Sequence, residues 1–216
     1  MASRMPTNPS PSPSRSPSRS NAATEEFSLV IEALLRTLEA KDLKLRRHSE
    51  RVARFAGHIA AQLQMTDEER DNLHHGALLH DIGNIGIPDT ILLKPSGLSQ
   101  MEFDEMKLHP IIGQQIVKPL KSSAGLRPLI RSHHEKMDGS GYPDELSGDE
   151  IPRLVRILSV VDVYDSLRSE RAYREAFGHE AALEILQQES TRGWWDASIV
   201  DLLAHMEVAE SEFAPV

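Results

Sequence analysis

The apolar positions of this chain recur with helical spacing over most of its length. The first stripe begins near Thr24 and follows the i, i+3, i+4, i+7 pattern, with members at Phe27, Val30, Ile31, Leu34, Leu35 and Leu38. A second stripe covers about residues 41–64. A third helix is predicted from Thr66, which forms a capping box with Glu69, and we expect Gly83 to end it. These segments predict a packed helical domain.

The second half of the chain continues the helical pattern. Ser99 and Glu102 form another capping box, and Pro110 fits the first turn of a helix, with His109 at its N-terminal side. No segment alternates convincingly as a strand would, and no internal repeat is visible, so the predicted fold class is all-α. A glycine-rich loop is expected over residues 138–149, and further helices are predicted before His133-His134, after Pro152, and over residues 179–189 and 197–208.

Length and composition fit one domain. The chain has 216 residues, of which 39% are hydrophobic, which is enough for a core of its own. Residues 1–23 are a Ser/Pro-rich segment with little apolar content, and we expect them to be a disordered tail. The predicted domain covers residues 24–208, and residues 209–216 are expected to form a flexible C-terminal tail.

The charge and the apolar runs narrow the range of partners. The net charge of −9 argues against broad binding to DNA, RNA or an anionic membrane surface. No apolar run approaches the length of about 20 residues that spans a bilayer, and the N-terminus lacks the apolar region of a secretory signal. We therefore expect a cytoplasmic protein. The stripe of the first helix fits packing on its own domain or a homodimer contact equally well.

The candidate chemistry begins at His80-Asp81, a histidine and a carboxylate at the end of an apolar run. A buried carboxylate without partners is costly, so further ligands are expected nearby. One histidine on an inner helix face is more often a hydrogen-bonded structural residue than a ligand, but seven such positions together predict a metal site. They are His48, His80, Asp81, His109, His133, His134 and Asp162.

Two metal ions fit this set better than one, because a single ion rarely takes more than six protein ligands. The chain has no cysteine, and mixed imidazole and carboxylate donors suit Fe, Mn, Ni, Co or Zn. A pair of such ions about 3.5–4 Å apart is the usual apparatus of phosphoester hydrolysis, with a bridging hydroxide as the nucleophile. Asp81 could bridge both ions. Hydrolysis of a phosphoester is therefore the reaction that the residues predict.

Several motifs then resemble a known family. HS-x-RVA begins at His48, HDIG covers residues 80–83, KLHP covers 107–110, HHE-x-x-DGSGYP covers 133–143, DVYDSL covers 162–167 and RAYR covers 171–174. Together they resemble the HD-GYP family of cyclic di-GMP phosphodiesterases over roughly residues 30–205. HDIG alone is shared across the wider HD phosphohydrolase superfamily, whereas HHE followed by DG-x-GYP is much more specific.

The resemblance implies an all-α, HD-type helical bundle with a buried dinuclear or trinuclear metal site. The implied reaction cleaves cyclic di-GMP to linear pGpG or on to GMP, and the substrate is the implied partner. The family's metal ligands carry over onto the seven histidines and aspartates named above, and His80 and Asp81 are also implied in catalysis. The family's substrate contacts carry over onto Arg171 and Arg174, for which a solvated helix face is an equally good interpretation, and onto the loop residues Gly141 and Tyr142. Tyr142 could contact substrate, but anchoring the loop is the favoured role.

Two departures from the family pattern affect the expected turnover and the expected number of metal ions. Asn84 stands where HDIGK members have a lysine, so this candidate catalytic position offers a neutral hydrogen bond in place of a cation. Lys44 stands where members with a third metal have a glutamate, so we predict two divalent ions, of Fe, Mn or a similar metal. Asn84 also motivates an alternative, a hydrolysis-impaired cyclic di-GMP-binding regulatory module. A third hypothesis is an HD-type phosphohydrolase acting on another nucleotide, against which the GYP loop and RAYR weigh.

Overall fold

The computed structural model of the protein describes residues 19–170 and 174–206. Its named elements within them are all helices, which are joined by turns and loops, and an isolated bridge links Asp138 and Ser147. The predicted all-α class is therefore confirmed. The long helices are α1 (Arg19–Lys41), α2 (Leu43–Gln62), α3 (Asp67–Leu79), α6 (His109–Val117), α8 (Arg153–Arg168), α9 (His179–Thr191) and α10 (Ala197–Ala204). Shorter elements are η1 (Ile82–Gly86), α4 (Asp89–Leu92), α5 (Gln100–Met106), η2 (Lys121–Ser123), α7 (Arg127–Ser132) and η3 (Gly148–Glu150).

The ends of the chain test only part of the predicted domain limits. Helix α1 begins at Arg19, so residues 19–23, which we expected in the disordered tail, are helical. The rest of that tail and the predicted C-terminal tail lie outside the described residues, as does Arg171. Among the described helices, none has the combined length and apolarity that crossing a membrane requires.

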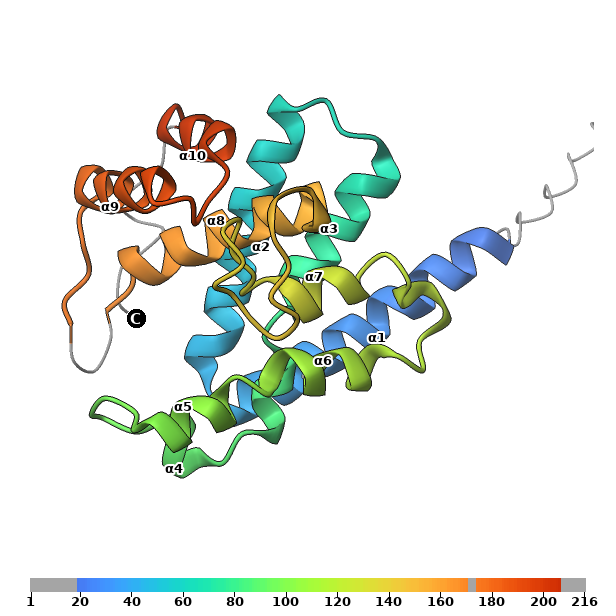
Figure 1. Ribbon diagram of the computed structural model, residues 1–216. Coiled ribbons are helices and arrows are strands. Elements are labelled where there is room, and N and C mark those ends of the chain that lie inside the picture. The colour runs from blue at the N-terminus through green and yellow to red at the C-terminus, as the bar shows by residue number, and fades with distance from the viewer. Residues whose placement is uncertain (1–18, 171–173, 207–216) are drawn as a thin grey trace, which may run out of the picture.

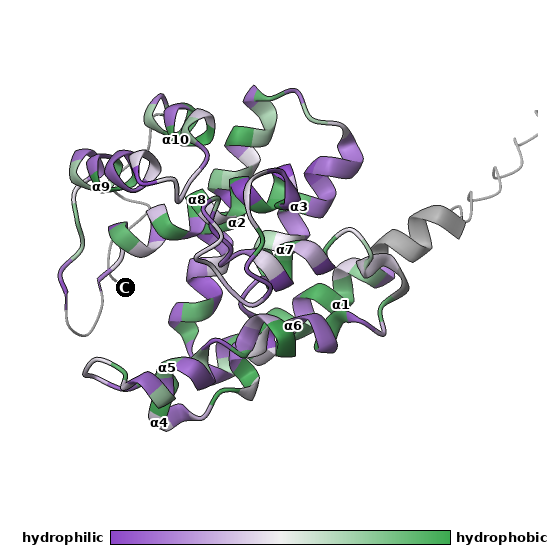
Figure 2. Cartoon of the chain, in the orientation of Figure 1, coloured by the Kyte–Doolittle hydropathy of each residue, from purple (hydrophilic) through white to green (hydrophobic). Residues whose placement is uncertain are grey.

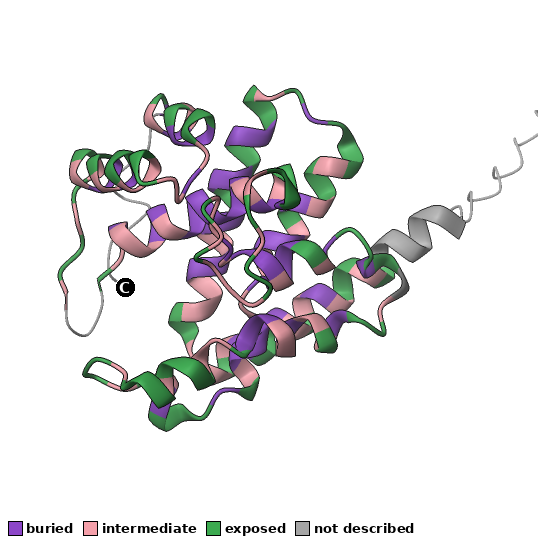
Figure 3. Cartoon of the chain, in the orientation of Figure 1, coloured by how far each residue is buried: buried purple, intermediate pink, exposed green. Residues whose placement is uncertain are grey.

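Helix α2 lies at the centre of the bundle and contacts α1, α3 and α8 (Figure 1). Most helices carry apolar and polar residues together, as Figure 2 shows, and their apolar sides face the interior. Many buried positions lie on α2, α3, α7 and α8, whereas α4 and α5 are largely exposed (Figure 3). A polar side chain buried inside this bundle therefore needs hydrogen-bond or metal partners there.

Two hydrophobic clusters fill the interior. The larger one joins α2, α3 and α8 to α9 and α10, and its members include Phe55 and Tyr164, whose rings pack edge to face at 5.5 Å between centroids. The smaller one packs Leu38 of α1 against Leu79, Ile82 and residues of α6 and α7. Since Leu79 and Ile82 flank His80-Asp81 in the chain, this second cluster fixes the position of that pair.

The predicted helix starts are confirmed where a local signal defines them. Thr66 and Ser99 are N-caps with complete capping boxes, and Pro110 lies in the first turn of α6. The predicted end of the third helix at Gly83 is wrong, because α3 ends at Leu79 and the chain tightens into η1. Gly83 serves another purpose. A Cβ at Gly83 would overlap the carbonyl oxygen of His109, so glycine lets η1 lie against α6.

We expect Gly83→Ala to lower the free energy of unfolding by about 1–3 kcal/mol, because the added methyl group must push η1 away from the backbone of α6. Gly57→Ala in α2 is the matched control, since no atom lies within 4 Å of its added Cβ. That variant should gain about 0.5–1 kcal/mol from helix propensity. Urea unfolding measures both, and a Gly83→Ala protein as stable as the wild type would contradict the close contact.

Candidate metal centre

The seven predicted ligands come from separate elements and converge in the interior. His48 lies on α2 and Asp162 on α8, while His109 is the first residue of α6. The others follow helix ends: His80 and Asp81 come directly after α3, and His133 and His134 directly after α7. Their donor atoms form overlapping groups in which all lie within 4.8 Å of one another: His48, His80 and Asp162; His109, His133 and His134; and His80, Asp81 and His133.

Local hydrogen bonds orient three of the imidazole rings in the same way. Each ring donates its Nδ1–H to the backbone carbonyl three residues earlier in the chain. The pairs are His80 with Ala77 (2.7 Å), His109 with Met106 (2.8 Å) and His133 with Ile130 (3.0 Å). A carbonyl oxygen can only accept, so the proton of each neutral ring is on Nδ1 and the Nε2 lone pair is free for a ligand. Such hydrogen bonds are typical of metal-binding histidines.

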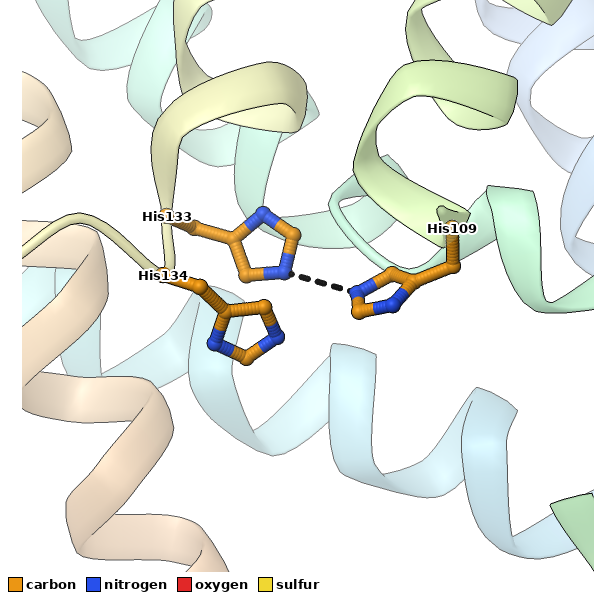
Figure 4. Close-up of side chains that lie close together, drawn as sticks. All are labelled: His109, His133 and His134. Carbon is orange, nitrogen blue, oxygen red and sulfur yellow. Dashed lines mark hydrogen bonds between the residues drawn. The ribbon is translucent and has the colours of Figure 1, made fainter. Parts of the chain in front are cut away.

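The free nitrogens face one another. The Nε2 atoms of His109 and His133 are 3.2 Å apart, and Figure 4 shows these two rings and that of His134 turned toward a common point. A hydrogen bond between the two Nε2 atoms would require an extra proton on one ring. Burial and the imidazole of His134 lower the pKa of His133 well below its ordinary value, which disfavours that proton. The Nε2 atom of His80 is buried without a hydrogen-bond partner. Bound cations would satisfy these lone pairs, so the donor set fits metal ions.

Asp81 lies between two sides of the cluster. Its Oδ2 is 3.7 Å from Nε2 of His80 and 3.9 Å from Nε2 of His48. Its Oδ1 is 3.3 Å from Nε2 of His109 and 4.0 Å from Nε2 of His133. Burial disfavours the charged carboxylate, but the surrounding imidazoles, that of His80 foremost, lower the pKa of Asp81 to about 2. An ionised carboxylate therefore presents one oxygen to each side.

His48 is held by two carboxylates. Its Nε2 is 2.9 Å from Oδ1 of Asp162, and its Nδ1 is 2.6 Å from Oδ2 of Asp165. Burial disfavours the imidazolium, yet hydrogen bonds to Asp162 and Asp165 raise the pKa of His48 to about 10. In this arrangement both ring nitrogens donate. A metal ion at Nε2 would replace one of these protons, as metal binding to histidine requires.

Asp165 is a site residue that the sequence analysis missed. Its side chain is fully buried, and besides His48 it accepts hydrogen bonds from Nε (2.6 Å) and Nη2 (2.9 Å) of Arg51. The available signal was the spacing of three residues between Asp162 and Asp165, which places both carboxylates on one face of α8. Arg51 lies three residues after His48 on α2. These two residues of α2 therefore contact Asp162 and Asp165, which are also three residues apart, on α8.

The loop that contains Gly141 and Tyr142 lies against His134. The Tyr142 ring is 4.8 Å from the His134 ring at an interplanar angle of 31°, and the Tyr142 backbone N–H donates to the His134 carbonyl (3.2 Å). A Cβ at Gly141 would collide with the backbone of Glu135, so this position needs glycine. Burial, together with the charges of Asp81 and Asp162, raises the pKa of Tyr142. The Tyr142 phenol is therefore neutral and lies within the electrostatic influence of the carboxylates of Asp81 and Asp162.

Glu135 anchors this loop and was also missed in the sequence analysis. It is buried, and its carboxylate accepts hydrogen bonds from the backbone N–H groups of Asp144 (2.7 Å) and Leu146 (3.1 Å). These two bonds attach the segment after Pro143 to the residue that follows His134. The HHE sequence therefore joins two candidate ligands to the carboxylate that holds the loop.

Two further predicted site residues, Asn84 and Arg174, are not among the grouped metal donors. Asn84 is buried, its Oδ1 has no hydrogen-bond partner, and its backbone N–H donates to the Asp81 carbonyl (3.0 Å). Arg174 donates from Nη1 to the Leu167 carbonyl (3.1 Å) and from Nη2 to the Ser166 carbonyl (2.7 Å). It therefore caps the C-terminus of α8. Contact of Arg174 with a substrate stays a prediction.

Comparisons with known proteins agree with this geometry. The sequence model of the family described as "HD domain" matches residues 32–199, and the chain belongs to this family, in its HD-GYP group. The chain is similar to the cyclic di-GMP phosphodiesterase response regulator RpfG of Xanthomonas campestris, with 39% identity over 85% of this chain and 49% of that protein. It is also similar to the 3'3'-cGAMP-specific phosphodiesterase 3 of Vibrio cholerae, with 38% identity over 74% of this chain and 35% of that protein.

Solved structures share the fold. The HDG"Y"P protein Bd1817 of Bdellovibrio bacteriovorus superposes with a TM-score of 0.63 at 24% identity, over 74% of this chain and 51% of that one. The HD domain of the Listeria monocytogenes phosphodiesterase PgpH superposes with a TM-score of 0.58 at 15% identity, over 79% of this chain and 92% of that one. The chain spans half or less of the length of the curated relatives named above.

We expect Asp165→Asn to lower the affinity for Mn²⁺ by about 10–100-fold, because the amide cannot hold the His48 ring and the Arg51 guanidinium together as the carboxylate does. Titration calorimetry with the metal-free protein measures this affinity. Asp201→Asn, on the exposed side of α10, is the control and should bind as the wild type does. Unchanged affinity in a folded Asp165→Asn protein would exclude a role of Asp165 in orienting a ligand.

Proposed function

We propose that this chain is a metal-dependent phosphodiesterase that hydrolyses cyclic di-GMP to pGpG, to GMP or to both. The observation that carries the proposal is the position of Asp81, whose two carboxylate oxygens face different histidines. Such an arrangement supports a pair of ions, which is the usual equipment for hydrolysing phosphoesters. The names of the relatives, which are phosphodiesterases of cyclic di-GMP or 3'3'-cGAMP, agree with the reaction and with the class of substrate.

Two divalent transition-metal ions, of Fe, Mn or a similar metal, are the proposed cofactors. One side of the centre offers His48, His80 and Asp162, and the other offers His109, His133 and His134. Asp81 is the proposed shared ligand. When bound, such ions lower the pKa of a water molecule and neutralise charge that develops on phosphate oxygens. The nitrogen and oxygen donors, without thiolate, agree with this choice of metals.

The chain's own residues would bind and orient the substrate around that centre. Tyr142 lies over His134 and can place its neutral phenol beside a phosphate or base. Arg171 and Arg174 are the proposed cations for the phosphates, because an acidic protein must supply local positive charge to hold a dianion. Arg174 would have to exchange its bonds to the Ser166 and Leu167 carbonyls for that contact. Gly141 lets the loop lie against the Glu135 backbone, which keeps Tyr142 close enough to contact a substrate bound at the metal centre.

The choice between cyclic dinucleotides is the second part of the proposal. Relatives with nearly equal identity carry names that specify cyclic di-GMP in one case and 3'3'-cGAMP in another. These substrates differ in one base and share the diphosphodiester ring that would contact the metal side of the site. We propose cyclic di-GMP as the substrate, and 3'3'-cGAMP, which corresponds to the hypothesis of another nucleotide, is the competing substrate to compare.

We expect the chain loaded with Mn²⁺ or Fe²⁺ to convert cyclic di-GMP to pGpG or GMP, with product separation by anion-exchange chromatography. Asp81→Ala should lower kcat by more than about 100-fold, since even residues that only orient ligands cost 10–100-fold. Asp201→Ala, exposed on α10, is the control and should keep the wild-type rate.

Preferential cleavage of 3'3'-cGAMP would replace the proposed substrate while leaving the reaction class in place. Full activity in Asp81→Ala would overturn the role of that carboxylate. Metal analysis of the active protein should give two equivalents per chain, and fewer than two would contradict the dinuclear centre.

We expect Asn84→Lys to raise kcat with little change in KM, because lysine adds a cation where asparagine can offer only a neutral hydrogen bond. Asn84→Leu controls for side-chain size without charge. Tight binding of cyclic di-GMP by the wild type without any product, and product formation only by Asn84→Lys, would establish the hydrolysis-impaired regulatory module instead. Equal kcat in wild type and Asn84→Lys would show that position 84 does not limit turnover.

A further inference from the structure

A pocket of about 330 Å³ lies between α6, α7 and residues 146–152, and none of the candidate metal ligands lines it. Its volume is at the lower end of the range typical of small-molecule sites. Gln114 of α6 forms one side and Arg127 and Arg131 of α7 form another, and Leu146 and Pro152 come from the loop. Charged and apolar groups therefore meet in one concave surface.

The two arginines of this pocket differ in their partners. Arg131 is fully engaged: Nε and Nη2 donate to the Asp144 carboxylate (2.6 and 2.7 Å), and Nη1 donates to Oε1 of Gln114 (3.0 Å). Arg127 is half-buried, and its guanidinium forms no hydrogen bond or ion pair within the part of the chain that the structure describes. A guanidinium without an acceptor is available to an acidic group that enters the pocket.

Glu150 also lines the pocket and is the carboxylate that could compete for Arg127. Its Oε2 instead accepts hydrogen bonds from the backbone N–H and the hydroxyl of Ser147, both at 3.0 Å. These bonds lower the pKa of Glu150, so its charge is kept in the turn at η3. Asp144 is likewise committed to Arg131. The guanidinium of Arg127 is therefore the group in this pocket that remains available to an anion.

The other walls are apolar. Pro128 of α7 and Leu146 and Pro152 of the loop line the pocket beside the arginines, and Ala124 lies at an exposed position on its edge. Such walls gain from covering an apolar body but cannot solvate a small inorganic ion. The chemistry of the pocket matches a ligand with both parts.

We propose that this pocket binds a small organic anion, with its acidic group against Arg127 and its apolar body between Pro128, Leu146 and Pro152. The site is separate from the candidate metal centre but connected to it through the chain. Helix α7 ends directly before His133, and Arg131 holds Asp144, which follows the Tyr142-Pro143 pair. A ligand here would rest on the same helix and loop that position one side of the metal centre.

Benzenesulfonate is a suitable probe, because it joins an apolar ring to an anion that binds metals weakly. Titration calorimetry with the metal-loaded protein should show 1:1 binding with a dissociation constant on the order of 1 mM or below. Arg127→Gln should weaken it about tenfold or more, since a charge-assisted hydrogen bond is lost. Ala124→Trp should abolish binding by filling the edge of the pocket. Benzyl alcohol, which lacks the anion, should not bind measurably.

Two controls separate this site from the proposed function. Arg36→Gln removes an exposed arginine that pairs with Glu32 on α1 and should leave binding unchanged. Asp81→Ala should also bind benzenesulfonate as the wild type does, whether or not the chain hydrolyses cyclic di-GMP. Equal binding by wild type and Arg127→Gln, or loss of binding in Asp81→Ala, would overturn the proposal. Inorganic phosphate that binds as tightly as benzenesulfonate would overturn the organic class of the ligand.

Discussion

The interior of this protein depends on hydrogen bonds that its histidines make at helix ends. Three rings donate Nδ1–H to the carbonyl three residues earlier, which leaves their Nε2 lone pairs pointing into one buried space. Two of these nitrogens, in His109 and His133, stand 3.2 Å apart. Lone pairs at this distance repel unless a cation lies between them, so the local geometry of the helix ends already creates a need for a positive charge in the interior.

The hydrophobic clusters keep those helix ends in place. The smaller cluster covers Leu79 and Ile82, the neighbours of His80-Asp81, with residues of α1 that contribute no ligand. Lys41, at the end of α1, also donates to the Ile87 carbonyl (2.8 Å), which ties the same helix to the end of η1. The larger cluster holds α2 and α8 together and thereby brings His48 to Asp162. The packing of apolar side chains thus sets the distances between polar ones.

The chain belongs to the HD domain family, and buried residues beside the candidate ligands support the metal centre. Asp165 and Arg51 form a buried pair beside His48, and Glu135 fixes the loop behind His134. Neither carboxylate is among the candidate ligands, but each holds an element that carries one. Such supporting groups decide how firmly ligands are held, and they determine where a change outside the metal centre would affect it.

The all-α class, the capping boxes at Thr66 and Ser99, and the candidate ligands could be predicted from the residues alone, because each depends on residue type, helical spacing or a contact three residues away. The end of α3 at Leu79 could not, because the close approach of η1 to α6 depends on the His109 backbone, 26 residues after Gly83. The partners of Asp165 and Arg174 and the unpaired guanidinium of Arg127 could not be predicted either. These depend on which distant groups compete for the same donor or acceptor, and only the packed chain settles that competition.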